Sequence, residues 1–294
     1  MKMKWSSIAV FVLLLSCKKE ESNRKGQIDT MSFSVLTYNI AGLPEGISGS
    51  HPLKNTPYIG QRINDYDIVH VQEDFNYHKL LVKHDNHPYE TPTKAISVPF
   101  ADGLNTLSNY RILDLKRIQW KDCTAADCLT PKGFSFSRIN FNDDFLIDFY
   151  NVHANAGDKP LEMAARRKNI TQLVEYVDSH SGDYPVVIMG DLNCRYSRTG
   201  DNIRIILDRN FKDAWVEKER NGSLPALDDI GFVCETGSGN GPDCEVVDKI
   251  FYRSTDDIEL ILTDFELPTE KFSLNGRWLS DHRPMFGQFM IVRR

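Results

Sequence analysis

Short runs of β-branched and aromatic residues alternate with turn-forming clusters from Phe33 almost to the C-terminus, and this alternation constrains the fold more than any other feature. Apolar residues recur at helical spacing over residues 161–179 and, more briefly, over 202–208. The alternating runs outnumber the helical segments, so strands dominate the predicted fold. The long helix over 161–179 is suited to cover a sheet. Because a sheet that is apolar on both faces must bury both, we expect an α+β fold with two packed β-sheets and helices outside them. The clearest strands are predicted at 34–38, 68–72, 133–139, 145–152, 186–189, 249–252, 258–265 and 285–291.

The composition indicates one large domain over residues 32–294. The chain has 294 residues, of which 41% are hydrophobic, and this is enough for one substantial core. No internal repeat or linker divides the region. The net charge of −6 argues mildly against binding nucleic acid through a broad basic face, although a nuclease needs only a local basic patch and a cation.

The first residues form an export signal. Lys2 and Lys4 precede the apolar run 8–15, which is too short to span a membrane. The run ends in Leu-Leu-Ser-Cys17, which resembles the lipobox of bacterial lipoproteins, in which the cysteine is lipidated. We therefore predict a lipoprotein signal peptide at residues 1–16, and a lipidated Cys17 with a flexible tether at 17–31. A cleaved secretory peptide without lipid is the alternative.

This interpretation places the protein in the cell envelope, exported and lipid-anchored at the outer membrane or cell surface. Export implies an oxidising compartment, in which neighbouring cysteines form disulfides. Cys123 and Cys128 close one short loop, and Cys234 and Cys244 flank a glycine-rich one, so we predict two local disulfides. Zinc binding by these four is the rival, but neither pair has C-x-x-C spacing. Cys194 is left over and is interpreted as a packing residue.

Acid, amide and imidazole groups stand at the ends of several predicted strands. Polar groups at strand ends converge on one rim when the strands share a sheet, and there a rigid scaffold can hold chemistry. Taken singly, each group could be a cap, a turn residue or a structural histidine. The segments are 36–39, 69–73, 150–153, 189–193 and 279–284, with 248–251 between the last two.

Together these groups suit the hydrolysis of a phosphodiester with a hard divalent cation. Mg²⁺ prefers oxygen ligands and usually takes only one or two carboxylates, so Glu73 is the natural ligand, with the amide oxygen of Asn39 nearby. Mn²⁺ or Ca²⁺ are alternatives. Asp191 and Asn193 are two positions apart on a tight turn, so one could orient the attacking water while the other contacts the phosphate.

Two histidines could move protons or stabilise charge. His282 is a candidate general base because the ordinary pKa of imidazole lies near neutrality. Asp248 would hold its ring in the correct tautomer. His153 could donate a hydrogen bond to the phosphoryl oxygen that gains charge in the transition state.

The same ordered series resembles the endonuclease/exonuclease/phosphatase superfamily, which includes DNase I-like nucleases, bacterial sphingomyelinases and inositol polyphosphate phosphatases. The resemblance extends from Phe33 to Ile291, and its most specific motifs are Gly-Asp-x-Asn at 190–193 and Ser-Asp-His at 280–282. It implies a four-layer αββα sandwich with Mg²⁺ at the rim, and the hydrolysis of phosphodiester bonds. It also implies that Asp281 supports the metal or its waters. The family's carboxylate or Tyr after the metal-binding Glu has no clear counterpart, and Asp102 or Asn105 could substitute.

The substrate is left open among several classes. A small or lipid-linked phosphodiester, as for a sphingomyelinase, is favoured because the insertions at 42–55 and 94–101 are not strongly basic. A DNase I-like endonuclease, a phosphoinositide phosphatase and a non-catalytic surface-binding lipoprotein are the alternatives. The sequence indicates no protein partner, and we expect a monomer. Basic candidates for holding extra phosphates are Arg195, Arg198 and Arg204. Trp120, Trp215, Phe232 and Trp278 are candidates for an apolar rim, although core packing is the favoured role for most of them.

Overall fold

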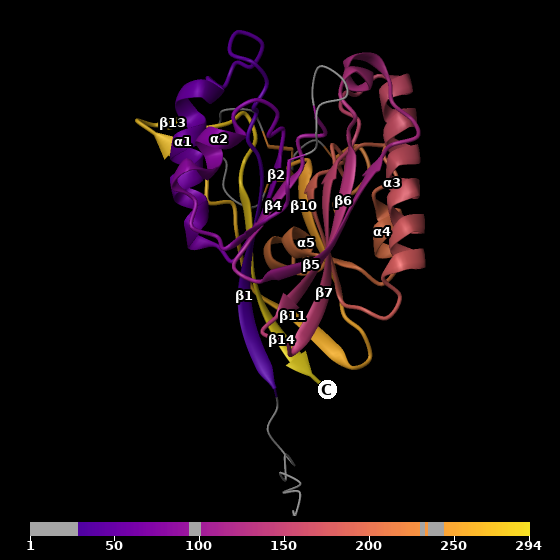
Figure 1. Ribbon diagram of the computed structural model, residues 1–294. Helices are drawn as coiled ribbons and strands as arrows, with labels where there is room; N and C mark the ends of the chain where they lie inside the picture. The colour runs from indigo at the N-terminus through magenta and orange to yellow at the C-terminus, as the bar shows by residue number, and fades with distance from the viewer. Residues whose placement is uncertain (1–28, 94–100, 230–232, 235–243) are drawn as a thin grey trace, which may run out of the picture.

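The computed structural model describes residues 29–93, 101–229, 233–234 and 244–294 as two packed β-sheets with helices on their outer faces. Helices α1 (Pro52–Arg62) and α2 (His78–Leu81) lie outside one sheet, and α3 (Pro160–His180) and α4 (Arg204–Leu207) lie outside the other (Figure 1). The layers follow the order helix, sheet, sheet, helix, as the sequence predicted.

The first sheet has six strands in the order β11-β14-β1-β2-β4-β3, and the second has six in the order β5-β6-β7-β8-β10-β9. The bounds in the first are β1 Thr30–Asn39, β2 Ile68–Gln72, β3 Tyr89–Glu90, β4 Asn105–Ser108, β11 Ile258–Glu266 and β14 Met285–Arg293. Those in the second are β5 Arg111–Gln119, β6 Gly133–Phe141, β7 Phe145–His153, β8 Val186–Asp191, β9 Lys212–Asp213 and β10 Asp248–Arg253. A separate hairpin joins β12 (Ser273–Leu274) to β13 (Arg277–Trp278).

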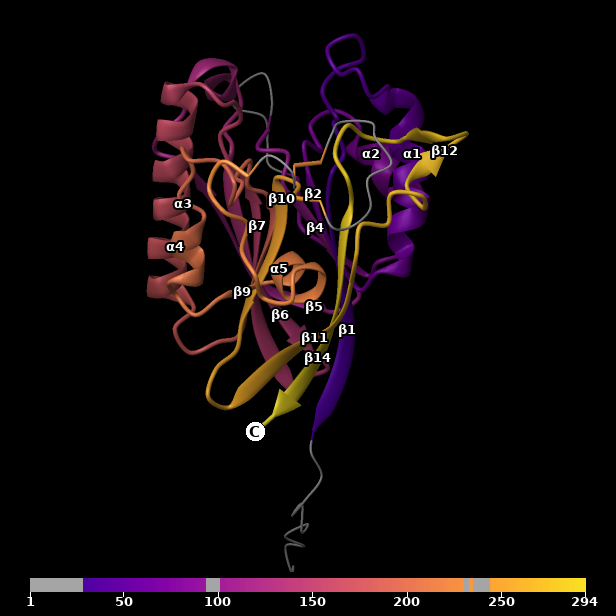
Figure 2. The same ribbon diagram turned by 180° about the vertical axis from the view of Figure 1, so that it is seen from behind.

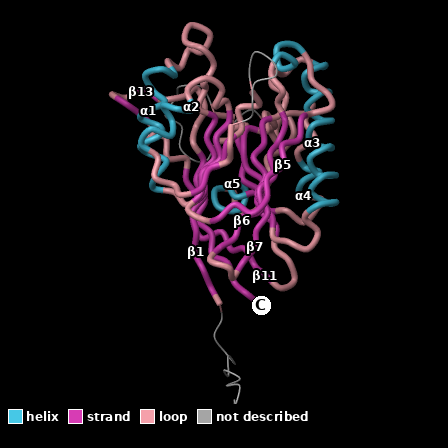
Figure 3. Tube along the Cα trace, viewed as in Figure 1, coloured by secondary structure: helices cyan, strands magenta, loops and turns pink. Residues whose placement is uncertain are grey.

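The remaining helical elements are short. Helix α5 (Ala214–Glu219) contacts β10 in one sheet and β11 in the other, and it lies between the two sheets as seen from behind (Figure 2). Three 3-10 helices are η1 (Ile63–Asp65), η2 (Val82–His84) and η3 (Ala125–Leu129). Coloured by secondary structure, the strands fill the centre of the molecule and the long helices flank them (Figure 3).

Each sheet contains one parallel pair near its middle. β1 runs parallel to β2, and β7 runs parallel to β8, whereas the other neighbouring strands are antiparallel. The C-terminal ends of parallel strands meet at the same edge of a sheet. This topology therefore brings the ends of β1, β2, β7 and β8 to the rim of the sandwich, and these are ends at which the sequence carries polar groups.

The core between the sheets is aromatic. The ring of Phe33 stacks on Phe289 with centroids 5.4 Å apart and lies 4.8 Å from Phe141. Every residue of β7 except Leu146 is buried, since the other sheet covers one face of the strand and α3 covers the other. Such two-sided burial explains why this strand is mostly apolar, with Asp148, Asn151 and His153 as its polar residues.

Buried polar side chains link the two sheets beneath the rim. Gln72 donates through Nε2 to Thr37 Oγ1 at 3.0 Å and to Asn151 Oδ1 in the opposite sheet at 2.8 Å. Asn151 in turn donates through Nδ2 to the carbonyl oxygen of Val71 at 3.0 Å. Because an unpaired polar group would be costly at this depth, these bonds favour one relative position of the sheets.

Several elements differ from the sequence prediction. Strand β5 was missed because its exposed positions break the apolar pattern, as in its segment Asp114-Leu-Lys-Arg117. Helix α1 was missed because Pro57 lies inside it. The long helix agrees with its apolar spacing, but Arg166 and Asn169 are also buried on its inner face. The tether was expected to reach residue 31, yet β1 begins at Thr30, which pairs with Val292.

Both predicted disulfides are present, with Cα–Cα distances of 5.3 Å for Cys123–Cys128 and 4.9 Å for Cys234–Cys244. Cys194 is buried, as expected of a packing residue. The signal peptide 1–16, Cys17 and Phe232 lie outside the described residues. In the part of the chain that the structure describes, no helix is long and apolar enough to cross a membrane.

Candidate active site

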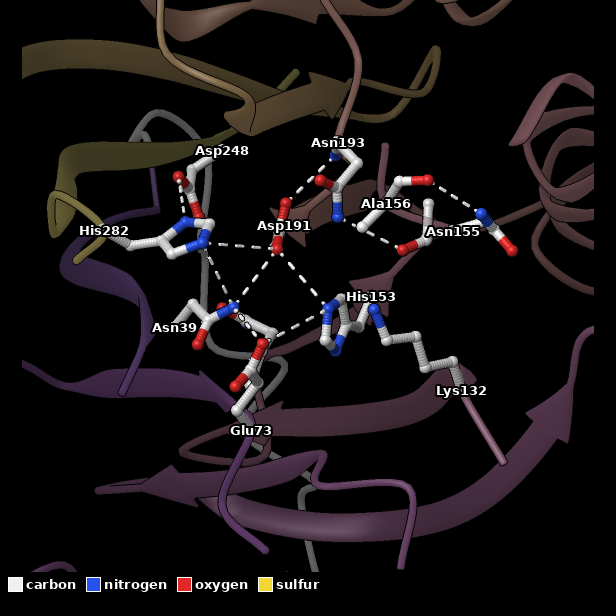
Figure 4. A network of polar contacts seen from close by, with 12 residues as sticks. Asn39, Glu73, Lys132, His153, Asn155, Ala156, Asp191, Asn193, Asp248 and His282 are labelled. Atoms are coloured by element: carbon white, nitrogen blue, oxygen red, sulfur yellow. Dashed lines mark hydrogen bonds and ion pairs between the residues drawn. The ribbon is translucent and has the colours of Figure 1, made fainter. Parts of the chain in front are cut away.

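The polar strand ends meet in one cluster at the rim of the sandwich (Figure 4). Asn39 ends β1, Glu73 follows β2, His153 ends β7, and Asp191 ends β8. Across the second sheet, Asp248 at the start of β10 pairs in register with Asp191. The structure thus brings together groups whose sequence positions span most of the domain.

Asn39 lies at the centre of this cluster. Its amide nitrogen is 3.2 Å from Glu73 Oε1, 3.1 Å from Asp191 Oδ2 and 3.4 Å from His282 Nε2. Its amide oxygen accepts a hydrogen bond from the backbone N–H of Ala41 at 3.0 Å, which fixes the orientation of the amide. The nitrogen therefore faces the carboxylates, where we had expected the oxygen to face a metal. In this arrangement Asn39 orients Glu73 and Asp191.

His282 and Asp248 form the expected pair. Nδ1 of His282 lies 2.9 Å from Asp248 Oδ2, and its Nε2 points to Asp191 Oδ2 at 3.7 Å. Burial alone would disfavour the imidazolium, but the carboxylates of Asp248 and Asp191 raise the pKa of His282 well above its usual value. Ser280 holds the loop in place, since its hydroxyl donates to the carbonyl of Asn39 at 2.7 Å.

His153 is enclosed by the sandwich and is only 1% exposed. Its Nε2 is 3.4 Å from Asp191 Oδ2 and 3.9 Å from Glu73 Oε1. Burial, followed by the nearby charge of Lys132, lowers the pKa of His153 well below its usual value. The ring is therefore neutral at physiological pH. Trp120 supports it from behind by donating Nε1–H to the carbonyl oxygen of His153 at 2.7 Å.

The backbone around the cluster adopts left-handed conformations at two functional positions. Glu73 has φ 58° and Asn193 has φ 52°, values that residues other than glycine seldom adopt. Gly190 precedes Asp191 at φ 151°, and an added Cβ there would lie 2.1 Å from the carbonyl oxygen of Val152. The Gly-Asp-x-Asn motif thus needs its glycine because β8 passes close to β7.

The turn after β8 is braced by Asp191 itself and by an arginine. Asp191 Oδ1 accepts the backbone N–H of Asn193 at 3.0 Å, and Asn193 Nδ2 donates to the carbonyl of Ala154 at 3.2 Å. The carbonyl of Asn193 accepts a hydrogen bond from Arg198. Asp201 forms ion pairs with Arg198 and with Arg166 of α3, each at 2.8 Å. These bonds position Asn193 against the end of β7.

Asp102, Asn105 and Asp281 lie at the edge of the cluster. Asn105 donates to Asp74 Oδ2 at 2.8 Å, and Asp102 pairs with Arg117 at 2.9 Å, so both belong to a neighbouring network and not to the contacts of His153. Asp281 is exposed and accepts a 3.4 Å hydrogen bond from the hydroxyl of Ser280. Among the described residues, it forms no hydrogen bond with Asn39 or Glu73.

Lys132 is a site residue that sequence reasoning missed. It is 8% exposed, points toward the cluster (Figure 4), and forms a 2.8 Å ion pair with Asp127 inside the Cys123–Cys128 loop. After burial, its positive charge is the next cause that lowers the pKa of His153. Burial raises the pKa of Asp191, and His282, His153 and then Lys132 lower it. The only sequence signal was a lysine next to the start of a predicted strand, and this pattern is too common to indicate a site.

The oxygen-rich donor set is compatible with a hard divalent cation. Glu73 retains about 20% exposure of its side chain, and burial raises its pKa, a cost that a bound cation would offset. Ligand atoms of Asp191, Asp248 and His282 lie within 4.8 Å of one another, the grouping with metal-site spacing among the described residues. The carboxylates of Glu73 and Asp191 approach the amide of Asn39 from two sides, and carboxylate oxygens are suitable ligands for an ion of the Mg²⁺ class.

Known proteins are similar to this chain in sequence and in fold. The model of Endonuclease/Exonuclease/phosphatase family 2 matches residues 52–236. A sphingomyelinase of Mycobacterium tuberculosis is 38% identical over 276 residues, which cover 90% of this chain and 54% of that protein. The chain thus spans about half the length of this curated relative.

Among solved structures, sphingomyelinase C from Streptomyces griseocarneus aligns with a TM-score of 0.59 and 18% identity over 90% of this chain and all of that one. A variant of beta toxin from Staphylococcus aureus, solved with bound magnesium ions, aligns with a TM-score of 0.60 and 16% identity over 87% of this chain and 99% of that one. At such identities these structures establish the fold alone. The family model and the 38% identical relative show that this chain belongs to the endonuclease/exonuclease/phosphatase family.

Proposed function

We propose that this protein is a Mg²⁺-dependent phosphodiesterase that cleaves a lipid-linked phosphodiester of the sphingomyelin type. The observation that carries the proposal is the His282–Asp248 pair at 2.9 Å, directed at the cluster of Asn39, Glu73 and Asp191. The 38% identity to a sphingomyelinase over 90% of the chain supports the lipid substrate. The non-basic character of the chain, with its net charge of −6, supports it further.

Glu73 and Asp191 are the groups that would hold the cation. Their carboxylates flank the amide of Asn39 at 3.2 and 3.1 Å, and one or two carboxylates are the usual complement for Mg²⁺. When bound, the ion would act as a Lewis acid on a phosphoryl oxygen. Asp281, exposed beside His282, would act through waters. Mn²⁺ and Ca²⁺ are tested alongside Mg²⁺ because both accept oxygen ligands.

The remaining side chains divide the proton and charge tasks. Asp248 holds the His282 ring so that Nε2 faces the substrate, and the neutral form of His282 accepts the proton of the attacking water. The water oxygen bonds to phosphorus, the bond from phosphorus to the lipid alcohol oxygen breaks, and the departing alkoxide takes a proton from solvent water. Asn193 contacts the phosphate or orients the water. His153, neutral and buried, donates a hydrogen bond to the phosphoryl oxygen as negative charge grows on it.

The direct test is hydrolysis by the purified chain with disulfides intact. Sphingomyelin in mixed micelles would be compared with phosphatidylinositol phosphates, duplex DNA and RNA, each with Mg²⁺, Mn²⁺, Ca²⁺ or chelator. We expect release of the phosphorylated head group from sphingomyelin, and its loss in chelator. Cleavage of DNA at the highest rate would replace the lipid assignment by a nuclease. Absence of hydrolysis from every substrate would favour a non-catalytic binding role.

The cellular location of the protein is a separate part of the proposal. We infer that the chain is exported and anchored to the cell envelope through a lipid on Cys17, because this residue follows an apolar run in a lipobox-like sequence. Such an anchor would hold the enzyme near lipid substrates. Cys17→Ser should leave the protein unacylated and outside the detergent phase on phase separation. Wild-type protein without acyl chains by mass spectrometry would refute the anchor.

A further inference from the structure

Three arginines follow the Gly-Asp-x-Asn motif, and the structure separates their roles. Arg198 forms a 2.8 Å ion pair with Asp201 and also binds the carbonyl of Asn193. Arg204 donates to the carbonyl of Pro225 at 2.8 Å and to a second backbone carbonyl at 3.3 Å. Both guanidinium groups are therefore occupied by the protein itself, and their roles are structural.

Arg195 differs from its two neighbours. Its backbone N–H donates to Asp201 at 2.9 Å, but its Nε is buried without a hydrogen-bond partner. Among the residues that the structure describes, its guanidinium forms no hydrogen bond or ion pair. Burial, followed by the charge of Arg198, lowers the pKa of Arg195. A guanidinium that is partly desolvated and unpaired costs free energy, which a binding function would justify.

Arg195 lines the same cavity as the acid-base pair of His282 and Asp248. This cavity of about 170 Å³ is lined by Arg195, Asp248 and His282, with Trp278 contributing an apolar wall. The carboxylate of Glu245 also lines it, but it accepts hydrogen bonds from the backbone of Tyr196 and from the hydroxyl of Ser197, at 2.5 and 2.8 Å. Glu245 also forms an ion pair with Lys249 at 3.6 Å. Among the described residues, no carboxylate forms an ion pair with Arg195, although the negative charges of Glu245 and Asp201 partly oppose the lowering of its pKa.

We propose that Arg195 binds an anionic phosphate oxygen of the substrate in this cavity, beside His282. The inference rests on the proposed phosphodiesterase function and names a residue that selects the substrate. A guanidinium presents several N–H donors in a planar fork that matches phosphate oxygens. The oxygen belongs either to the scissile phosphate or to a second phosphate next to it, and the two sources share this chemistry.

The first test measures binding without turnover. Inorganic phosphate would be titrated by calorimetry in the presence of Mg²⁺ into the wild type, Arg195→Gln and Arg195→Lys. We expect Arg195→Gln to weaken phosphate binding by about tenfold and Arg195→Lys to lie between the two, because lysine keeps the charge but loses the fork. Equal affinities in the wild type and Arg195→Gln would overturn the proposal. The matched control is Arg111→Gln, which removes an exposed arginine at the start of β5, the end of the sheet far from His153.

The second test identifies the phosphate. Initial rates would be measured on bis(p-nitrophenyl) phosphate, which has one phosphate, and on a 5′-phosphorylated dinucleotide, which has two. If Arg195 contacts the scissile phosphate, Arg195→Gln should raise KM for both by about tenfold with a smaller change in kcat. An increase for the dinucleotide alone would assign the contact to a second phosphate. Unchanged KM for both would count against any substrate contact.

The two tests fail independently of the proposed function. A chain that cleaves no phosphodiester but binds phosphate through Arg195 would refute the hydrolase and leave the anion site standing. An active enzyme with wild-type phosphate affinity in Arg195→Gln would do the reverse. Thermal unfolding of each variant checks the fold, and Arg195→Lys keeps the test informative if the glutamine variant is unstable.

Discussion

Nδ1 of His282 lies 2.9 Å from Oδ2 of Asp248, although the two residues are 34 positions apart in the chain. Asp248 reaches this position because β10 pairs with β8 and aligns it with Asp191. The imidazole therefore has a carboxylate beside each nitrogen, with Asp191 Oδ2 at 3.7 Å from Nε2. One carboxylate orients the ring, and the other belongs to the cluster that we propose faces the substrate.

The pair predicts non-additive losses of activity. His282→Ala should lower kcat by roughly 10²-fold or more while leaving metal affinity nearly unchanged, since it removes the proton acceptor and no expected ligand. Asp248→Asn should have a milder effect, because it disturbs only the orientation of the ring. The double variant should be little worse than His282→Ala alone. Initial rates under saturating substrate measure this, and near-wild-type turnover in His282→Ala would remove the mechanism.

Glu73 predicts a different response. Glu73→Gln keeps the shape of the side chain but removes an anionic ligand, so the Mg²⁺ concentration for half-maximal rate should rise by about tenfold or more. Asn39 would still contact the amide that replaces the carboxylate. The measurement is a metal titration of the initial rate. His282→Ala serves as the comparison, because its metal dependence should match that of the wild type.

From the position of Lys132 we predict that its positive charge contributes to activity at the rim. It lies near Glu73, His153 and Asp191, where a phosphoryl group would gain negative charge. Lys132→Met keeps much of the buried aliphatic volume but removes the ammonium, and we expect kcat to fall by about tenfold with little change in Tm. Lys121→Met removes an exposed lysine nearby and is the control. Equal kcat values for the two variants would contradict the prediction.

From the burial of His70 we predict that the free energy of unfolding decreases in acid. Burial lowers the pKa of His70 from 6.5 to about 3, so the folded state stays neutral while the unfolded state takes up a proton. Stability is therefore fully present above pH 6.5 and is lost as the pH falls toward 3, by at most about 1.4 kcal/mol per pH unit from this group.

The test is urea unfolding between about pH 4 and about pH 7, a range that covers most of that window and extends just above its upper limit. His70→Gln cannot become charged and should show a shallower decline in the free energy of unfolding. His84→Gln, at an exposed position, should follow the wild type. A decline of equal slope in His70→Gln would show that other groups govern acid unfolding.

Much of the fold was readable from local patterns. The segments 34–38, 145–152 and 186–189 are rich in β-branched and aromatic residues and form strands, and the apolar spacing over 161–179 matches α3. Both patterns arise because these side chains are buried. Both disulfides followed from short spacings between cysteines. Strand β5 escaped because most of its side chains are exposed, so its residues show little contrast between faces.

The sequence by itself determined which chemical groups this protein carries at its strand ends, since a carboxylate, amide or imidazole after an apolar run is a local fact. Only the tertiary structure decided their contacts. The parallel pairing of β1 with β2 and of β7 with β8 brings the ends to one rim, and the bond from Ala41 to Asn39 turns that amide toward the carboxylates. The tertiary structure likewise decided where Lys132 and Arg195 lie relative to the site, because the burial and charge environment of a side chain depend on neighbours that are distant in the chain.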